Sequence, residues 1–110
     1  MSIQFALTAP NPIAIKLLTT NPTIVAGSAT ARTVVDWLQC TEIAGATPSL
    51  SIDIFDGTNA VYLRSAKAMT AKEEVLRTQG FALNPGQYLR VTASVANQVD
   101  VTGMAGLQRG

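Results

Sequence analysis

The sequence predicts a single all-β domain, an antiparallel β-sandwich of immunoglobulin-like or jelly-roll-like type, with about seven or eight strands. Three observations predict it. The 110 residues suit one domain with a core of its own. Short apolar or alternating runs recur between Gly, Pro, Asn and Asp residues, as in sandwiches and small barrels. No long amphipathic helical segment separates these runs, so an α/β architecture is not expected.

The beginning of the chain predicts an extended arm over residues 1–12, followed by the sandwich domain over 13–110. The boundary is set by Pro10 and Pro12, because proline has no backbone N–H to donate and does not fit a regular helix or a central strand. A first strand is then expected to start at Ile13.

The arm is the predicted assembly interface. Ile3, Phe5 and Leu7 alternate with smaller or polar residues, which is the period of a strand. Such a segment can add to the sheet of a neighbouring subunit, or it can be an edge strand of its own domain. In both cases it offers apolar side chains and unpaired backbone groups to a partner.

The remaining strands are predicted from local periodicity. They cover residues 13–20, 23–26, 32–43, 49–55, 60–64, a segment ending near 69, 74–78, 88–95 and a last strand beginning at 99. The segment 65–77 also has good helix formers, so a single helical turn is an alternative there. The tail over 103–110 has only a loose pattern.

The run over 32–43 is apolar on both faces, which predicts a central strand covered from two sides. Strict alternation assigns Val34, Leu38 and Cys40 to one face, and Val35 and Trp37 to the other. The run over 49–55 alternates more clearly, with Asp53 on the face directed away from the core.

Two turns follow from residue chemistry. Asp56-Gly57 predicts a hairpin loop, because glycine accepts the positive φ of tight turns. Asn84-Pro85-Gly86 predicts a type II turn, in which proline presets φ at the second position and glycine supplies a positive φ at the third. These five residues are therefore expected to be structural.

The composition favours contacts with other proteins. Charged residues make up 14% of the chain, against roughly 25% in average soluble proteins. A surface so poor in charge exposes neutral or apolar area, which often becomes an interface. The net charge of +1 and the dispersed basic residues give no field that would attract nucleic acid or an anionic membrane.

The sequence offers no pattern for catalysis, and we expect no enzyme activity, no cofactor and no metal. There is no His, which removes His-based nucleophile systems and the commonest zinc ligand. Asp53, Asp56 and Asn59 do not have the spacing of a calcium loop, so Asp53 is expected to face solvent and Asp56 to form the turn. The single Cys40 is expected to be buried and inert.

The first eighteen residues have no basic region ahead of an apolar stretch, so neither a signal peptide nor a membrane span is expected there. We therefore expect the protein to fold in a reducing cytoplasm.

A second functional interpretation stays open. Trp37, Tyr62 and Tyr88 would form a stacking platform for carbohydrate if they shared one exposed face. Burial of these rings would exclude it.

Three stretches carry a family resemblance: TVVDWLQCTEIAG, DIFDGTNAVYL and VLRTQGFALNPGQYLRVTASVANQVDV. Over residues 32–101 the chain resembles the small β-sandwich virion proteins of tailed bacteriophages, namely capsid decoration proteins and neck or tail accessory proteins. The resemblance implies a non-enzymatic structural subunit, made in the host cytoplasm and placed in the virion. Its implied partners are further copies of itself and the major capsid, neck or tail proteins.

Overall fold

A computed structural model describes residues 7–77 and 79–108, and within these residues every regular element is a strand. The strands are β1 (Leu7–Lys16), β2 (Thr23–Gly27), β3 (Thr33–Glu42), β4 (Ser49–Phe55), β5 (Ala60–Ala68), β6 (Glu74–Arg77), β7 (Phe81–Leu83), β8 (Tyr88–Ala93) and β9 (Val99–Gln108). This part of the chain therefore contains no helix long and apolar enough to cross a membrane.

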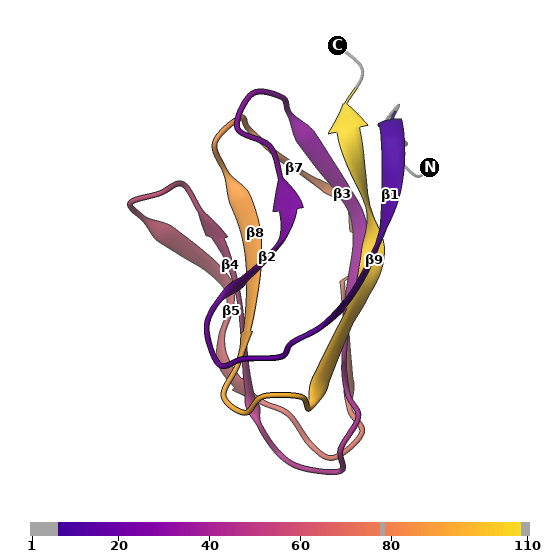
Figure 1. The fold of residues 1–110 in the computed structure, drawn as a ribbon, viewed down its shortest axis with the longest axis vertical. Coiled ribbons are helices and arrows are strands. Elements are labelled where there is room, and N and C mark those ends of the chain that lie inside the picture. The colour runs from indigo at the N-terminus through magenta and orange to yellow at the C-terminus, as the bar shows by residue number, and fades with distance from the viewer. Residues whose placement is uncertain (1–6, 78, 109–110) are drawn as a thin grey trace.

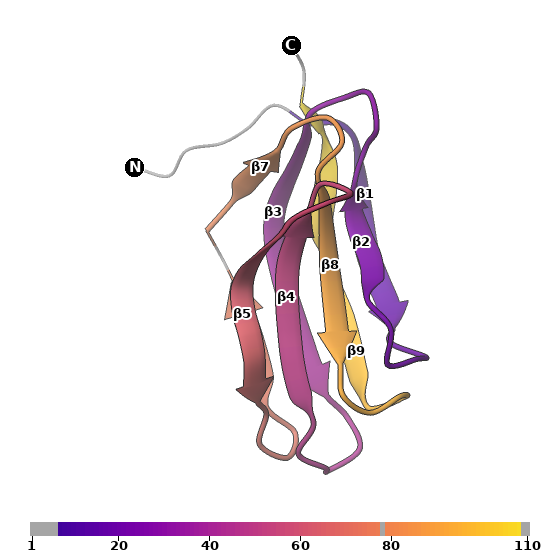
Figure 2. The same cartoon turned by 90° about the vertical axis from the view of Figure 1, so that its left-hand side faces the viewer.

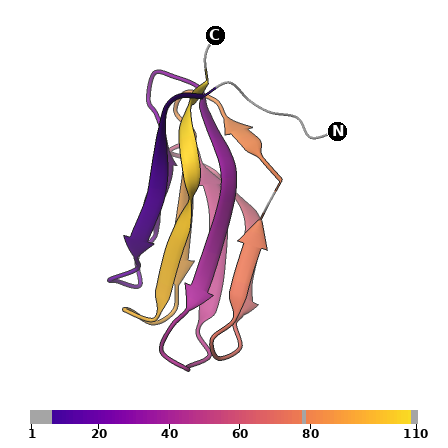
Figure 3. The ribbon, with the colours of Figure 1, turned by 90° about the vertical axis from the view of Figure 1, so that its right-hand side faces the viewer.

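The strands form two antiparallel sheets that face each other (Figure 1). One sheet has five strands in the order β1-β9-β3-β6, with β7 also paired to β3 (Figure 3). The other has four strands in the order β2-β8-β4-β5 (Figure 2). The predicted antiparallel β-sandwich is confirmed.

The connectivity is that of a jelly roll. The pairs β1·β9, β2·β8, β3·β6 and β4·β5 are nested, as if one long hairpin had been wrapped around itself. Both β6 and β7 pair with the same edge of β3, β6 along residues 38–41 and β7 along residues 33–35. Together they act as one interrupted strand, which reduces the nine strands to the eight of a jelly roll.

The core lies between the sheets and is aliphatic, because each strand turns alternate side chains inward. Its largest fully buried members are Leu17, Leu38, Leu50, Met69, Leu83 and Leu89. Cys40 is buried among them, and this burial raises the pKa of its thiol to about 12. The expectation of a buried cysteine is confirmed.

The first strand begins earlier than predicted. β1 starts at Leu7 rather than Ile13, so residues 7–12 belong to the sandwich and not to a separate arm. The prolines are tolerated because β1 is an edge strand, and its register shifts between Thr8 and Asn11. Residues 1–6, with Ile3 and Phe5 of the predicted interface, lie outside the described residues.

The predicted faces of β3 need a correction. A bulge between Val35 and Trp37 shifts the alternation, so that Val35 joins Leu38 and Cys40 in the core. Val34 and Trp37 lie on the opposite face. The central position of β3 is confirmed, since β9 lies on one side of it and β6 with β7 on the other.

The last strand is longer than its pattern suggested. β9 runs to Gln108 and pairs along its length with both β1 and β3. Gly103 interrupts the alternation of apolar and polar side chains by which a strand is predicted. A Cβ at this position would meet the Trp37 carbonyl oxygen, and it would lie 3.3 Å from Leu38 Cα. The backbones of β9 and β3 approach each other too closely for a side chain at that point.

Both predicted turns form, and the segment 65–77 contains no helical turn. Asp56 N–H donates to the Asn59 carbonyl at 3.2 Å, while Asp56 Oδ1 accepts the N–H groups of Thr58 and Asn59. Gln87 N–H donates to the Asn84 carbonyl at 3.0 Å, and Gly86 has a φ of 85°.

Candidate assembly surfaces

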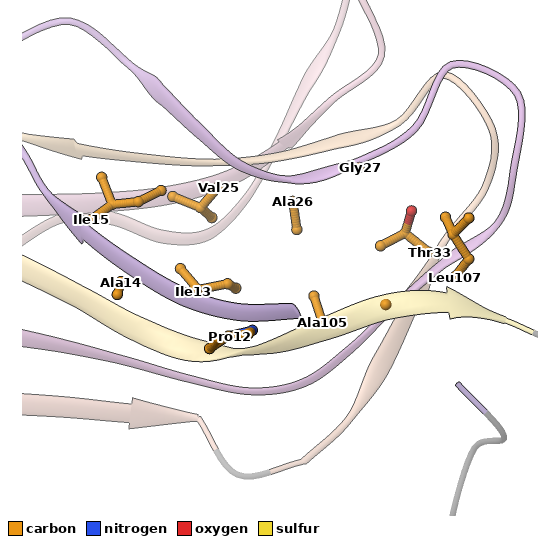
Figure 4. A pocket seen from close by; sticks show the side chains of 11 residues that line it. Pro12, Ile13, Ala14, Ile15, Val25, Ala26, Gly27, Thr33, Ala105 and Leu107 are labelled. Carbon is orange, nitrogen blue, oxygen red and sulfur yellow. The ribbon is translucent and has the colours of Figure 1, made fainter. Parts of the chain in front are cut away.

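One side of the sandwich is open. The slot between β1 of the five-stranded sheet and β2 of the four-stranded sheet has a volume of about 520 Å³ (Figure 4). It is lined by Pro12, Ile13, Ala14, Ile15, Val25, Ala26, Gly27, Thr33, Ala105, Gly106 and Leu107. Since none of these residues is charged, the slot suits an apolar occupant.

One polar atom in this slot has no partner. Thr33 is 4% exposed, and its Oγ1 makes no hydrogen bond within the described part of the chain. In Figure 4 this hydroxyl lies at the end of the slot where Leu107 is drawn. A buried hydroxyl without a partner costs roughly 1–3 kcal/mol, so an occupant able to hydrogen-bond would be favoured there.

Each strand that borders the slot has one edge without a partner strand among residues 7–77 and 79–108. There β1 pairs only with β9, and β2 pairs only with β8. Leu17 N–H donates to the Val99 carbonyl at 3.0 Å, and the alternation of an antiparallel ladder then turns the backbone groups of Ala14 and Lys16 outward. Pro12 occupies the next outward position, where its missing N–H breaks no ladder bond.

The outer face of the five-stranded sheet is the second apolar surface. Trp37 is 36% exposed and lies opposite Met104, while Leu76 is 53% exposed at the sheet's other edge. Pro12 and Ala14 continue this row on β1 and are exposed. Charged side chains lie near it as well: Lys16 Nζ and Asp100 Oδ1 pair at 2.8 Å toward one end, and Asp36, next to Trp37 in the bulge of β3, is exposed.

The outer face of the four-stranded sheet has a different character. Arg90 donates to both carboxylate oxygens of Asp53, with Nη2 2.5 Å from Oδ2, and its guanidinium carbon lies 3.9 Å from the centre of the Phe55 ring. Asp53 faces outward as predicted, but Arg90 covers it and leaves it 3% exposed. The hydrogen bonds that Arg90 donates to this carboxylate raise the pKa of Arg90.

The three candidate stacking rings do not share a face. Trp37 lies on the five-stranded sheet, whereas Tyr62 and Tyr88 lie on the outer face of the four-stranded sheet. Phe55 on β4 lies directly opposite Tyr88 and is the third ring on this face. The sequence pattern did not single it out. Its position two residues after Asp53 on an alternating strand was the available signal.

A buried carboxylate holds the loops at the lower end of Figure 1. Glu42 Oε1 accepts the N–H groups of Gly45 at 2.8 Å and Lys72 at 3.0 Å, and Oε2 accepts that of Ala44 at 3.0 Å. Burial acts to raise the pKa of Glu42, but these backbone hydrogen bonds outweigh it and lower the pKa. Its role is structural, and the sequence pattern gave no sign of it.

Within residues 7–77 and 79–108 no group of three His, Cys, Asp or Glu side chains could hold a metal ion. Asp53 is engaged by Arg90, and the carboxylate of Asp56 is used within its own turn.

Of the predicted assembly residues, only Leu7 falls within the described chain. It is the first residue of β1, and its backbone lies opposite Gln108 of β9. The predicted turn residues lie at loops between strands, Asp56 and Gly57 after β4 and Asn84, Pro85 and Gly86 before β8.

Comparisons with known proteins bear on the fold. No protein-family model matches the chain, and no curated protein matches it. Among solved structures, the chain is similar to a pentameric capsid protein isolated from metagenomic phage sequences, in two structures, each with a TM-score of 0.54 and 18% identity over 94% of this chain. It spans 66% of that capsid protein's length. A structure of infectious bursal disease virus, Gx strain, matches 94% of this chain and 34% of its own with a TM-score of 0.48 and 12% identity. The protein is thus an all-β sandwich with a fold similar to that of a phage capsid protein.

Proposed function

We propose that this protein is a non-enzymatic structural subunit of the virion of a tailed bacteriophage, either a capsid decoration protein or a neck or tail accessory protein. It would act by assembling with copies of itself and with the major capsid, neck or tail proteins. The observation that carries the proposal is a pair of apolar surfaces, the uncharged slot and the outer face of the five-stranded sheet around Trp37, on a chain with 14% charged residues.

Two further observations support this role. The fold is similar to that of a pentameric phage capsid protein, which makes a homo-oligomer of this chain a reasonable expectation. Strands β1 and β2 each have an edge that pairs with no other described strand, and such edges readily accept a strand from another chain.

Within this proposal, the contact between subunits is made by the N-terminal segment with Ile3, Phe5 and Leu7. Because β1 begins at Leu7, the part of this segment that precedes the strand is residues 1–6. Many copies, each burying a modest apolar area, would then form a stable shell or joint through multivalency.

The test is the oligomeric state of the full chain and of a chain lacking residues 1–6, measured by size-exclusion chromatography with light scattering. We expect the full chain to form a homo-oligomer. The shortened chain should run as a folded monomer, since β1 stays intact. A full chain that is monomeric at high concentration, or a shortened chain that still assembles, would contradict the arm as the subunit contact.

Carbohydrate binding is the second candidate, because Tyr62, Phe55 and Tyr88 lie on one outer face beside Arg90. Tyr62 is 54% exposed and is the ring best placed to stack on a sugar. If this function holds, affinity electrophoresis in polysaccharide gels should retard the protein. Tyr62→Ala should then abolish the retardation, while Trp37→Ala, on the opposite face, should not. Migration unaffected by every polysaccharide tested would dismiss this candidate.

A further inference from the structure

We propose that the slot between β1 and β2 is the receptor for residues 2–6 of a second copy, which would enter it as an added strand. The inference rests on the proposed function, in which the N-terminal segment makes the contact between subunits. It adds the place where that segment binds.

The lining of the slot matches the pattern of the segment. In a strand, Ile3 and Phe5 point to one side, and Ser2, Gln4 and Ala6 point to the other. The side with Ile3 and Phe5 would enter the apolar volume of about 520 Å³, where Val25 and Ile15 face each other across the opening (Figure 4). The polar side would stay in water.

The edge of β1 can bind the backbone of such a strand. Ala14 and Lys16 turn their N–H and C=O groups away from β9, toward the edge that pairs with no other described strand. An added strand would pair with these groups and extend the five-stranded sheet. Main-chain hydrogen bonds of this kind provide affinity, and the slot beneath them would select the apolar side chains.

The unpartnered hydroxyl favours a peptide over a purely aliphatic occupant. Thr33 Oγ1 is buried in the slot without a hydrogen bond among the described residues. A lipid tail would leave this hydroxyl without a hydrogen bond, whereas a peptide backbone supplies carbonyl and N–H groups that can bond to it.

Chain length favours a second copy over the same chain. To enter its own slot, the segment would have to turn back immediately before Leu7, where β1 begins. Of the six residues ahead of β1, a two-residue turn would use two. The other residues, about four, would then lie beside residues 7–10 only. The part of the slot lined by Ile13, Ile15 and Val25 lies beyond them. The contact is then heterologous, because it joins two different surfaces of the protein. Repeated contacts of this kind close into a ring when the rotation between neighbouring subunits is a whole fraction of a full turn.

The test is a cross-link between two singly substituted full-length chains, Phe5→Cys and Val25→Cys, mixed, allowed to exchange subunits and oxidised. We expect a disulfide-linked dimer containing one chain of each kind, identified by mass spectrometry after non-reducing electrophoresis. Cys40 should stay unreacted, because it is buried and its pKa is raised to about 12.

The matched control is Phe5→Cys mixed with Ile24→Cys. Ile24 is next to Val25 on β2, but it pairs with Arg90 and lies on the outer face of the four-stranded sheet, so it should give little cross-link. Equal cross-linking with both partners would overturn the inference. So would a doubly substituted Phe5→Cys/Val25→Cys chain that closes only within itself.

A second measurement separates this inference from the proposed function. In the assembled full chain the slot is filled, so the apolar dye ANS should bind weakly, and removal of residues 1–6 should raise its fluorescence. If removal of residues 1–6 abolishes assembly without a specific cross-link to position 25 or a rise in ANS fluorescence, the slot is the wrong receptor and the proposed function stands. If the full chain does not assemble at all, both this inference and the proposed homo-oligomer fall.

Discussion

At the scale of single residues, Glu42 is the side chain with the clearest physical role. Its carboxylate is buried, and backbone N–H groups of two loops stabilise it. No described salt bridge involves it. The lowered pKa means that the folded protein favours the ionised form more than the unfolded chain does. Glu42 therefore joins the loop that follows it to the loop of Lys72, a residue 30 positions further along the chain.

Replacement of Glu42 should destabilise the protein in a pH-dependent way. The stabilisation by a carboxylate with a lowered pKa is complete above its ordinary value of 4.5, and it is lost as the pH falls through the lowered folded value. Glu42→Gln presents an NH₂ group where an acceptor is needed, so we expect a drop of several degrees in melting temperature at pH 7. The difference from the parent protein should shrink steadily below pH 4.5.

The matched control is Glu74→Gln. Glu74 is exposed at the start of β6, and its replacement should change the melting temperature little at either pH. A Glu42→Gln chain whose deficit is the same at acidic and neutral pH would show that shape, rather than charge, matters at this position.

At the scale of the elements, the close contact between β9 and β3 depends on Gly103. A methyl group there would meet the Trp37 carbonyl oxygen at the bulge of β3, and backbone atoms cannot swing aside as a side chain does. We expect Gly103→Ala to lower the free energy of unfolding by about 1–3 kcal/mol. Urea denaturation would measure it, with Thr102→Ala, whose side chain lies on the outer face, expected to cost roughly 0.5 kcal/mol or less. Equal stability of Gly103→Ala and the parent would mean that the strands separate there at little cost.

The same contact explains what could be predicted from the sequence. The strands with strict alternation, such as β4, and the turns at Asp56-Gly57 and Asn84-Pro85-Gly86 were predictable, because their determinants are local. The bulge in β3 and the length of β9 were not, because each depends on a neighbouring strand. The early start of β1 was hidden for a similar reason, since its prolines are acceptable only at a sheet edge.

The candidate surfaces divide in the same way. The apolar alternation of Ile3, Phe5 and Leu7 is visible in the sequence, but the slot is assembled from β1, β2, β3 and β9 and requires the topology. Similarly, alternation directs Asp53 outward, whereas its cover by Arg90 depends on the pairing of β4 with β8.

At the scale of the whole molecule, the distribution of charge sets how an assembly should respond to salt and temperature. The described salt bridges, Lys16–Asp100, Lys67–Glu73 and Arg90–Asp53, are internal to the chain and use six of its fifteen Lys, Arg, Asp and Glu residues. The slot is lined without charge, so contacts made there would rest on apolar burial and backbone hydrogen bonds.

An assembly of this kind should survive high salt and weaken on cooling. Raising the ionic strength from about 0.1 M to about 1 M shortens the screening length from about 10 Å to about 3 Å, which dissociates complexes held by exposed ion pairs. Contacts based on apolar burial do not weaken under that change, whereas burial is less favourable at low temperature. Sedimentation velocity should therefore give the same oligomer at both ionic strengths and a larger fraction of free subunit near 4 °C than near 25 °C. Dissociation by salt alone would mean that charged residues outside the slot hold the subunits together.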